Sequence, residues 1–349
     1  MDRGRLSVIA CDSGKVFGDR VIAALHEKIR STAERDGLAN DLVESEIETI
    51  QLRKRDEVWF ASGEVKTQIQ ENVRGDDVYV VQNFHDPNSN RSINDELMAL
   101  LTAVNAAHQS DAEWVTAVVP LYPYSRQERK RGREGITAAQ VANFIESSGA
   151  DRVLTLDVHA EAVAGAFRLA KFENLRPYRV IVDHLKKNYD LTDFVIVSPD
   201  AGGAERARTY AKHFRTAFSL IDKVRDYDQP NIVKEVRLVG KVEGHNVLVV
   251  DDMIDTGGSL MRTLQAIRER GANDVYICCT HAILSDKAVE RLDKAYETGI
   301  IKKLIATDSV VWGQRLADRA WYEEVSVAHL FASVIKHVNQ GRSVSALLG

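Results

Sequence analysis

Short, uninterrupted apolar runs alternate with amphipathic helical patterns along most of this 349-residue sequence. The apolar runs occupy residues 76–82, 113–120, 152–160, 194–200, 216–222, 246–252 and 275–281. Apolar residues at helical spacing mark residues 96–108, 136–149, 204–214 and 259–271. Strands without polar alternation are typical of sheets buried on both faces, and helices between them favour parallel pairing. We therefore predict an α/β fold built on mainly parallel sheets flanked by helices.

The length of the chain exceeds the usual size of one domain, and the alternation is interrupted near residues 165–180, so we predict two domains. A net charge of −5 does not fit the basic footprint of a nucleic-acid-binding protein. No run reaches the roughly 18 apolar residues of a membrane-spanning helix, and the start lacks the apolar core of a signal peptide. The three cysteines show neither zinc-site nor disulfide spacing. We expect a cytoplasmic protein that binds neither nucleic acid nor membrane.

Polar or glycine-rich segments follow five of the expected strands. They cover residues 121–134, 157–161, 199–203, 223–229 and 251–259. Open α/β sheets bind ligands in the crevice at the carboxyl ends of their strands. The five segments therefore predict a composite site for charged ligands.

The most informative segment is 247–260, in which an apolar strand is followed by acids and then by a glycine-rich turn into a helix. Its polar and glycine residues are Asp251, Asp252, Asp255, Thr256, Gly257, Gly258 and Ser259. Glycines let the backbone approach an anion, and the start of a helix directs N–H groups at it. Adjacent carboxylates can accept hydrogen bonds from neighbouring sugar hydroxyls. Thr256 or Ser259 could instead only cap the helix, but two acids beside the whole turn favour a phosphorylated ribose.

This segment resembles the phosphoribosyl pyrophosphate-binding loop shared by type I phosphoribosyltransferases and ribose-phosphate pyrophosphokinases. Further segments are similar to the pyrophosphokinases in the same order, at residues 60–75, 123–130, 136–160, 196–208, 220–225, 275–292 and 343–348. The resemblance implies two tandem type I phosphoribosyltransferase-like domains, at 1–168 and 169–325. It also implies that a C-terminal segment, 326–349, packs back on the first domain.

The resemblance assigns ATP contacts to the N-terminal domain. The matching residues are Phe60, Ser62, Gly63, Glu64, Arg126 and Gln127. An aromatic ring can stack on adenine, a carboxylate can accept from its amino group, and a guanidinium can bind phosphate. The family usually has an aspartate where Ser62 stands. Without the resemblance, Phe60 would be interpreted as core and the basic run 126–130 as a solvated surface.

The resemblance also supplies a metal-associated pair, His159 and Asp200, and implies Mg²⁺ as the cofactor. Because Mg²⁺ prefers oxygen ligands, we interpret His159 mainly as a contact to polyphosphate or to metal-bound water. Ala201 replaces a histidine that the family commonly has after this aspartate. A single histidine or aspartate after a strand is more often structural, so both assignments depend on the resemblance.

Lys223 and Arg225 match the catalytic lysine and arginine of the family, and Arg225 is also expected to contact ribose 5-phosphate. They lie two residues apart in a predicted strand, so their side chains share a face. A mobile loop, residues 226–236, is expected to follow them and to close over the site. A basic surface pair is the alternative interpretation.

The resemblance implies Mg²⁺-dependent transfer of a pyrophosphoryl group from ATP to the C1 hydroxyl of ribose 5-phosphate. The products are phosphoribosyl pyrophosphate and AMP. Two alternatives are a non-catalytic regulatory relative of such a synthetase and a phosphoribosyltransferase. The family implies a homo-oligomer built from dimers, with a hexamer as one form. Residues 1–57 depart most from the family, and the charged part 31–57 has no assigned role.

Overall fold

A computed structural model of the chain describes residues 3–37, 39–130, 132–225 and 233–348, and the side chains at 223–225, 233–236, 346 and 348 are outside that description. The chain divides into two compact units. Unit 1 contains Met1–Pro177, Ser309–Val311 and Ser326–Gly349, whereas unit 2 contains Tyr178–Asp308 and Trp312–Val325. The chain therefore leaves unit 1, forms unit 2 and returns to unit 1.

Unit 1 is built on a five-stranded sheet in which every pairing is parallel. In sheet order the strands are β1 (Leu6–Ala10), β4 (Asp77–Val81), β5 (Trp114–Val119), β6 (Arg152–Leu156) and β7 (Lys171–Leu175). Nearly every residue of β1, β4, β5 and β6 is buried, which agrees with their uninterrupted apolar sequences.

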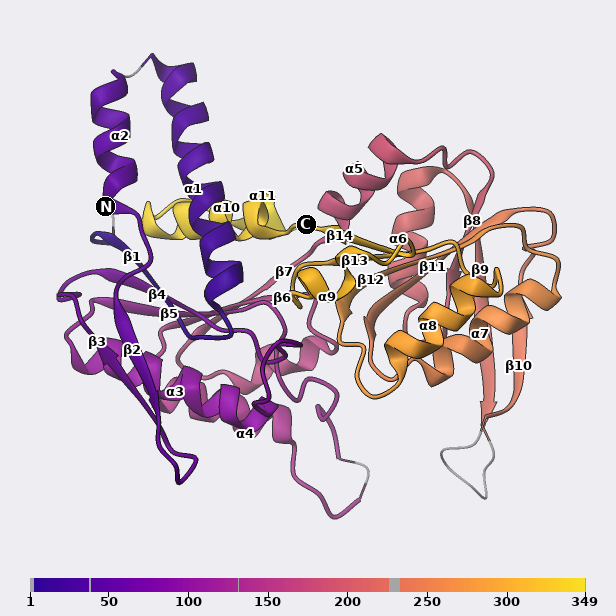
Figure 1. Ribbon diagram of the computed structural model, residues 1–349, viewed down its shortest axis with the longest axis horizontal. Helices are drawn as coiled ribbons and strands as arrows, with labels where there is room; N and C mark the ends of the chain where they lie inside the picture. Colours follow the sequence, from indigo (N-terminus) through magenta and orange to yellow (C-terminus); the bar gives the residue numbers. More distant parts are fainter. Residues whose placement is uncertain (1–2, 38, 131, 226–232, 349) are drawn as a thin grey trace. The chain divides into compact units, whose positions relative to one another are not determined.

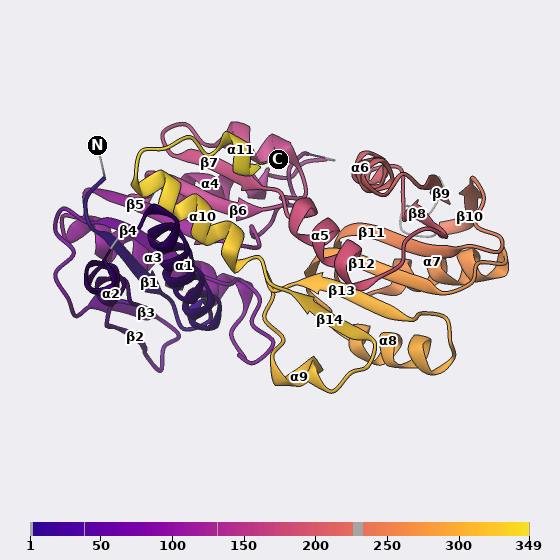
Figure 2. The same cartoon turned by 90° about the horizontal axis from the view of Figure 1, so that it is seen from above.

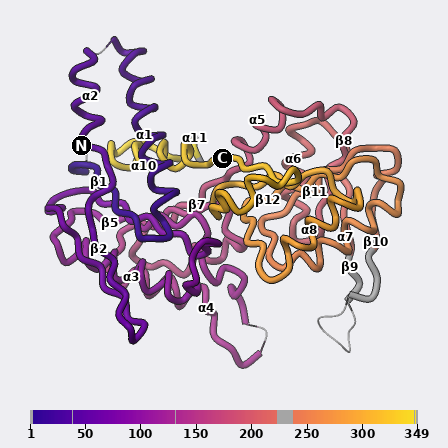
Figure 3. The backbone as a smooth tube through the Cα atoms, viewed as in Figure 1, coloured from indigo at the N-terminus to yellow at the C-terminus, as the bar shows by residue number. Residues whose placement is uncertain are grey.

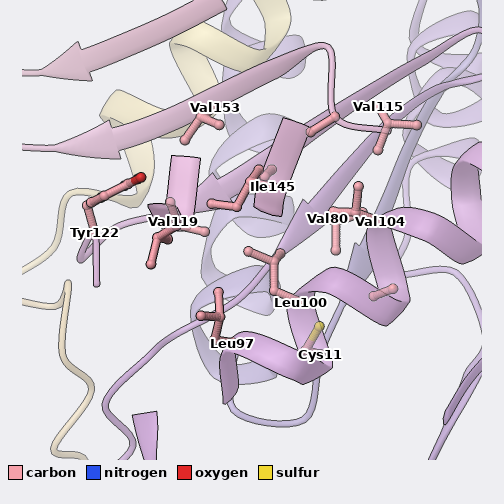
Figure 4. Close-up of a cluster of buried hydrophobic side chains, with 14 of the residues drawn as sticks. Cys11, Val80, Leu97, Leu100, Val104, Val115, Val119, Tyr122, Ile145 and Val153 are labelled. Atoms are coloured by element: carbon pink, nitrogen blue, oxygen red, sulfur yellow. The ribbon is translucent and has the colours of Figure 1, made fainter. Parts of the chain in front are cut away.

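Helices cover both faces of this sheet (Figure 1). One face carries α3 (Ile93–Gln109) and α4 (Thr137–Ser147), and the other carries α1 (Lys15–Asp36) and α10 (Ala328–Asn339). Figure 4 shows the core under α3 and α4, where Leu100 and Ile145 pack against the strands. On the opposite face the ring of Phe17 meets the edge of Phe331 at 5.3 Å, which joins α1 to α10. Figure 3 follows the chain from α1 near its start to α10 near its end.

The remaining elements of unit 1 are short. They are α2 (Asn40–Thr49), the antiparallel hairpin β2 (Arg55–Trp59) and β3 (Val65–Ile69), the 3-10 helix η1 (Glu161–Ala166), and α11 (Ser345–Leu348). Most of the charged segment 31–57, which the sequence left unassigned, forms the end of α1, α2 and β2.

The start of α3, at Ile93, lies before the helical pattern that the sequence marks at 96–108. Ser92 is the cap: its hydroxyl accepts a hydrogen bond from the backbone N–H of Asp95 at 3.3 Å. The Asp95 carboxylate in turn accepts from the backbone N–H of Ser92 at 2.8 Å. This reciprocal arrangement satisfies two backbone donors and fixes the start of the helix at Ser92.

Unit 2 contains a seven-stranded sheet in which only the edge strand β10 pairs antiparallel. In sheet order the strands are β10 (Val233–Val239), β9 (Ala217–Arg225), β8 (Phe194–Ser198), β11 (Asn246–Ile254), β12 (Val275–Ala282), β13 (Lys303–Thr307) and β14 (Tyr322–Val325). On one face lie α5 (Tyr178–Asn188) and α6 (Ala204–Phe214), and on the other α7 (Gly258–Glu269) and α8 (Ala288–Glu297). The small helix α9 spans Gln314–Ala317.

The prediction of an α/β fold with mainly parallel, helix-flanked sheets is confirmed by both units. The expected loop at 226–236 is only partly described, because residues 226–232 lie outside the described residues. The prediction of a loop is wrong for its second part, because Val233–Val236 belong to β10, whose backbone pairs with that of β9. Among the described helices, none is long and apolar enough to cross a membrane.

Candidate active site

Three neighbouring strands of unit 2 end at the same edge of the sheet. β8 pairs in parallel with β9 on one side and with β11 on the other. Asp200 follows the end of β8, and Asp251 lies in the last part of β11. Lys223 and Arg225 lie at the end of β9 by their backbone positions, and their side chains are outside the described part of the chain. The backbone thus brings the predicted catalytic and acidic residues to one edge.

The acids of β11 lie inside the strand, which continues two residues beyond the predicted run 246–252, to Ile254. Asp251 is partly exposed and Asp252 is buried. The pKa of Asp251 is raised to about 8. Burial is the largest cause, and the charge of the Asp252 carboxyl, its hydrogen bond with Asp251 and the charge of Asp200 follow. Carboxyl groups this close resist simultaneous ionisation. The strand end therefore concentrates negative charge that a cation or hydroxyl donors would stabilise.

The glycine-rich turn leads directly into α7, and no side chain caps that helix. The residue at the cap position is Gly257, which has φ of 75° and ψ of −5°. Side chains other than glycine rarely adopt this left-handed conformation, so the turn depends on the glycine. The interpretation of Thr256 or Ser259 as the cap residue is wrong, since Gly257 occupies the cap position of α7. The first turn of α7 is instead suited to an anion.

Two residues that the sequence did not single out hold this turn. The hydroxyl of Ser285 donates to the carboxylate of Asp255, and the Arg291 guanidinium donates to the backbone carbonyl of Thr256. Arg291 also pairs with Asp286 at 3.4 Å. Ser285 and Arg291 are 30 and 35 residues from their partners, so only the pairing of β11 with β12 brings them together.

Arg206, on α6, is a third residue that the sequence reasoning missed. Its guanidinium lies 3.9 Å from a carboxylate oxygen of Asp252. Its charge also lowers the pKa of Asp251, opposing the larger effects of burial and of the neighbouring acids. The sequence around Arg206 does not predict this contact, because Asp252 is 46 residues later in the chain.

Asp200 has a structural contact of its own. One carboxylate oxygen accepts a hydrogen bond from the backbone N–H of Gly203 at 3.0 Å, and the Ser198 hydroxyl donates to the Asp200 carbonyl at 2.7 Å. These contacts shape the turn between β8 and α6. The side chain of Asp200 is exposed, so the turn presents it to solvent.

The donor set of unit 2 fits a hard divalent cation. Asp200, Asp251 and Asp252 supply carboxylate oxygens, which Mg²⁺ prefers, and the raised pKa of Asp251 reflects their mutual repulsion. Within the described ranges, no group of three or more His, Cys, Asp or Glu side chains is arranged to hold a metal by itself. Such a cation would therefore complete its shell with water and with oxygens of a bound phosphate, as Mg²⁺ commonly does.

In unit 1, four predicted ATP contacts lie together in the turn between β2 and β3. Phe60 is half exposed, at 50% of its surface, so the alternative interpretation as a core residue is wrong. Its backbone N–H donates to the carbonyl of Glu64 at 2.9 Å, and Gly63 has a positive φ of 89°. The Ser62 hydroxyl donates to the Glu64 carboxylate at 2.8 Å. The turn thus presents an exposed ring beside a fixed carboxylate.

A polar network fixes the base of this hairpin. Trp59, Glu57 and Arg55 alternate along β2 and share one face. Arg91 stacks on Trp59 with its guanidinium carbon 4.3 Å from the ring centre, and it also pairs with Glu57 at 3.3 Å. The Arg55 guanidinium forms an ion pair at 2.8 Å with the carboxylate of Asp12, which lies just after β1. The hairpin is therefore tied to the carboxyl end of β1.

The other unit 1 candidates follow adjacent strands. Arg126 and Gln127 come after β5, and His159 comes after β6, its parallel neighbour. All three side chains are exposed. The backbone N–H of Gln127 donates to the carbonyl of Tyr124 at 2.9 Å, and its own carbonyl accepts from Ala138 at 3.3 Å, which joins the loop to α4. The sheet edge of unit 1 therefore gathers these residues as the sequence predicted.

Comparison with known proteins decides the family. Residues 13–149 match the model of the N-terminal domain of ribose phosphate pyrophosphokinase, and residues 178–321 match a phosphoribosyl transferase domain model. Ribose-phosphate pyrophosphokinase 1 of Listeria monocytogenes is 38% identical over 302 residues, covering 85% of this chain and 90% of the relative. This chain belongs to the ribose-phosphate pyrophosphokinase family.

Two further ribose-phosphate pyrophosphokinase relatives agree. The enzyme named ribose-phosphate pyrophosphokinase in Staphylococcus saprophyticus is 40% identical over 291 residues, with 82% of this chain and 87% of the relative covered. The crystal structure of phosphoribosylpyrophosphate synthetase from Mycobacterium smegmatis matches with a TM-score of 0.79 and 30% identity, covering 97% of this chain and 99% of that chain. The predicted fold of two tandem phosphoribosyltransferase-like domains is confirmed, as is the resemblance.

Proposed function

We propose that this chain forms phosphoribosyl pyrophosphate by transferring the pyrophosphoryl group of ATP to the C1 hydroxyl of ribose 5-phosphate. The observation that carries the proposal is the uncapped start of α7, which follows the acidic end of β11 in a chain whose unit 1 matches a pyrophosphokinase N-terminal domain. A phosphoribosyltransferase would need the loop but not that domain. The chain retains Lys223, Arg225 and the whole loop 251–259, and this disfavours a non-catalytic regulatory relative.

The ribose 5-phosphate site is assigned to the C-terminal domain, residues 169–325. The sugar phosphate lies against the start of α7, where Thr256, Gly257, Gly258 and Ser259 surround it. Asp251, Asp252 and Asp255 are placed on the hydroxyl side of the sugar, since carboxylate oxygens accept hydrogen bonds. A bound cation at this edge would favour the ionised form of Asp251 despite its raised pKa. The partial exposure of Asp251 supports a direct contact, whereas buried Asp252 is better placed to orient its neighbour.

ATP is assigned to the N-terminal domain, residues 1–168, with 326–349 as the segment that packs on it. Phe60 stacks on adenine, and Glu64 accepts from its amino group with Ser62 and Gly63 shaping the turn. The contact of Ser62 with Glu64 supports this arrangement, because it keeps the carboxylate at the tip of the hairpin. Arg126 and Gln127 are assigned to the phosphates or to the face of the base.

The proposed cofactor is Mg²⁺, with Asp200 as its carboxylate contact and His159 as a contact to polyphosphate or metal-bound water. The crowded carboxylates of unit 2 support a cation at this edge. When bound, Mg²⁺ would offset the negative charge of the ATP phosphates. Chain residues do the remaining work: they bind both substrates, align the C1 hydroxyl with the β-phosphorus and exclude water.

The reaction forms a bond between the C1 oxygen and the β-phosphorus and breaks the bond from that phosphorus to the α-phosphate oxygen. AMP leaves with that oxygen, and the C1 hydroxyl releases its proton to solvent. Negative charge grows on the nonbridging and leaving oxygens during transfer. Lys223 and Arg225, at the end of β9, are proposed to stabilise this charge, and Arg225 also to contact the sugar phosphate. The protein is proposed to act in the cytoplasm as a homo-oligomer built from dimers.

Incubating the pure protein with MgATP and ribose 5-phosphate tests the proposal. AMP and phosphoribosyl pyrophosphate should appear in equal amounts. A regulatory relative would give neither product alone. A phosphoribosyltransferase would instead consume added phosphoribosyl pyrophosphate in the presence of a purine or pyrimidine base, and that result would replace the proposal.

The sugar site can be separated from the ATP site by two substitutions. Asp251→Asn and Ser259→Ala should raise the KM for ribose 5-phosphate, tenfold or more for Asp251, because a hydrogen bond to a charged group contributes about 1.5–3 kcal/mol. The KM for ATP should stay close to that of the unchanged protein. Asp318→Asn, which removes one exposed carboxylate elsewhere in unit 2, is the control. A change confined to the KM for ATP would show that the loop does not bind ribose 5-phosphate.

The support of the turn by Arg291 gives a smaller expected effect. Arg291→Ala removes the donor to the Thr256 carbonyl, so the turn should lose alignment and the KM for ribose 5-phosphate should rise about fivefold. The KM for ATP and the kcat should change little. Lys294→Ala removes another exposed cation from α8, and it should have no such effect. Equal effects of both substitutions would indicate a general loss of charge instead of positioning.

A further inference from the structure

The hairpin of β2 and β3 in unit 1 forms a separate two-stranded sheet, with five residues in each strand. A two-stranded hairpin is marginally stable alone, so contacts with its neighbours must fix its orientation. It lies beside β1 and α3 (Figure 2). The Arg55 guanidinium donates to the Ala10 carbonyl of β1 at 2.6 Å, and the hydroxyls of Thr67 and Thr102 on α3 lie 3.1 Å apart.

The face that the hairpin turns toward these neighbours is polar on β2. Arg55, Glu57 and Trp59 are its less exposed residues, and each pairs with a less exposed residue of β3. Apolar packing is not directional, whereas hydrogen bonds and ion pairs require a defined geometry. The inner face of β2 can therefore fix the orientation of the hairpin and of the proposed adenine contacts at its tip.

Glu57 lies at the centre of these polar contacts, and its side chain is only 1% exposed. Oε2 accepts a hydrogen bond from the backbone N–H of Asp12 at 3.0 Å and lies 3.5 Å from the Arg55 guanidinium. Oε1 accepts from the indole N–H of Trp59 at 3.0 Å and from Arg91 at 3.3 Å. Both oxygens therefore have donors, as a buried carboxylate requires.

These contacts join three segments that are far apart in the sequence. Asp12 follows β1, Glu57 belongs to β2, and Arg91 precedes α3. Arg91 also pairs with Asp12 at 3.2 Å. Two arginines thus face two carboxylates, so loss of Glu57 alone would leave an excess of positive charge in a largely buried place.

Trp59 connects this network to the tip of the hairpin. It pairs with Val65 in the last pair of the two strands, and it directly precedes Phe60. Arg91 lies over the face of its ring at 4.3 Å, and Glu57 holds its indole N–H. A shift of Trp59 would therefore be passed through one peptide bond to the exposed ring of Phe60.

We propose that Glu57 and Arg91 are positioning residues for ATP, which hold Trp59 and so set the orientation in which the hairpin presents Phe60 and Glu64 to adenine. The inference rests on the proposed function, because that function places ATP at this hairpin. Contacts to the base are made equally before and during transfer, so better positioning lowers the KM for ATP without raising kcat. A role in folding alone would not separate these two constants.

The fluorescence of Trp59 tests the proposal without turnover. Titration of the unsubstituted protein with MgATP, in the absence of ribose 5-phosphate, should change the emission as ATP binds beside Trp59. The other three tryptophans lie outside the hairpin. Trp59→Phe keeps a ring under Arg91 but removes the indole, so the change should disappear. A change that persists in Trp59→Phe, or no change at saturating ATP, would overturn the proposal.

Steady-state kinetics of two single variants and their double variant tests the two positioning residues. Glu57→Gln and Arg91→Gln should each raise the KM for ATP about tenfold, with kcat and the KM for ribose 5-phosphate nearly unchanged. The double substitution removes one charge of each sign. It should raise the KM for ATP no further than either single substitution if both residues act through one network.

The matched control is Glu173→Gln, which removes the ion-pair partner of Arg152 on β6. Glu173 belongs to β7, at the opposite edge of the unit 1 sheet from β1, so the KM for ATP should stay unchanged. Equal rises in the KM for ATP in Glu57→Gln and Glu173→Gln, or a lower kcat with an unchanged KM, would contradict the proposal. Arg91, whose side chain is 29% exposed, provides the test if Glu57→Gln does not fold.

The outcomes separate this inference from the proposed reaction. An ATP-dependent signal from Trp59 in a protein that forms no phosphoribosyl pyrophosphate would refute the reaction alone. Normal synthesis with an unchanged KM for ATP in both Glu57→Gln and Arg91→Gln would refute the positioning role alone.

Discussion

Replacing Lys223 with alanine is expected to lower kcat by about a hundredfold or more, as loss of one transition-state donor commonly does. Both KM values should change little, because an interaction made only in the transition state lowers kcat and kcat/KM together. The reason is the position of the charge. The oxygens around the β-phosphorus gain negative charge only during transfer, and β9 ends beside β8 at the edge where we place the phosphates.

Arg225→Ala should lower kcat in the same way, with an added rise in the KM for ribose 5-phosphate if its guanidinium also reaches the sugar phosphate. The double substitution should lower kcat by much less than the product of the single effects if the two cations act as one unit. Lys241→Ala is the matched control, since this exposed lysine precedes β11 at the opposite end of the sheet. Steady-state kinetics, with folding checked by circular dichroism, measures all four proteins. A near-normal kcat in Lys223→Ala would refute both the catalytic assignment and the choice of β9 as its source.

Removing divalent cations should abolish synthesis altogether, and adding Mg²⁺ back should restore it. Without a cation, the close carboxyl groups of Asp251 and Asp252 resist simultaneous ionisation, and burial strengthens their repulsion. The ATP phosphates would also lack a counter-charge during transfer. The assay compares AMP formation before chelation, in excess chelator, and after Mg²⁺ is restored. Full turnover in excess chelator would show that the carboxylate edge serves some other purpose.

Most of the sheet could be predicted from the sequence because a strand buried on both faces leaves a local signal. The run 194–200 and the helix 204–214 are read from neighbouring residues alone, and the structure has β8 at Phe194–Ser198 and α6 at Ala204–Phe214. The loop at 251–259 was found for the same reason. Its acids, glycines and hydroxyls are contiguous, so their chemistry is visible before the fold is known.

Contacts between distant parts of the chain could not be predicted in that way. Arg291 and Ser285 support the turn from the region after β12, and Arg206 reaches Asp252 from α6. Nothing in the local sequence distinguishes these side chains from solvated surface residues. The different burial of Asp251 and Asp252 was also hidden, because it depends on β11 continuing to Ile254, so that the two acids point to opposite faces.

The return of the chain to unit 1 has a consequence for synthesis on the ribosome. Helix α10 supplies Phe331 against Phe17, and the Tyr79 hydroxyl on β4 donates to the Ile335 carbonyl at 3.3 Å. Residues 326–349 are translated after every strand of unit 2. Domains generally fold in the order in which they leave the ribosome, but here the first unit must wait with one face of its sheet uncovered. Unit 2 can therefore complete its fold before the unit that precedes it, and a nascent chain stalled before α10 should expose the apolar face of α1 to chaperones.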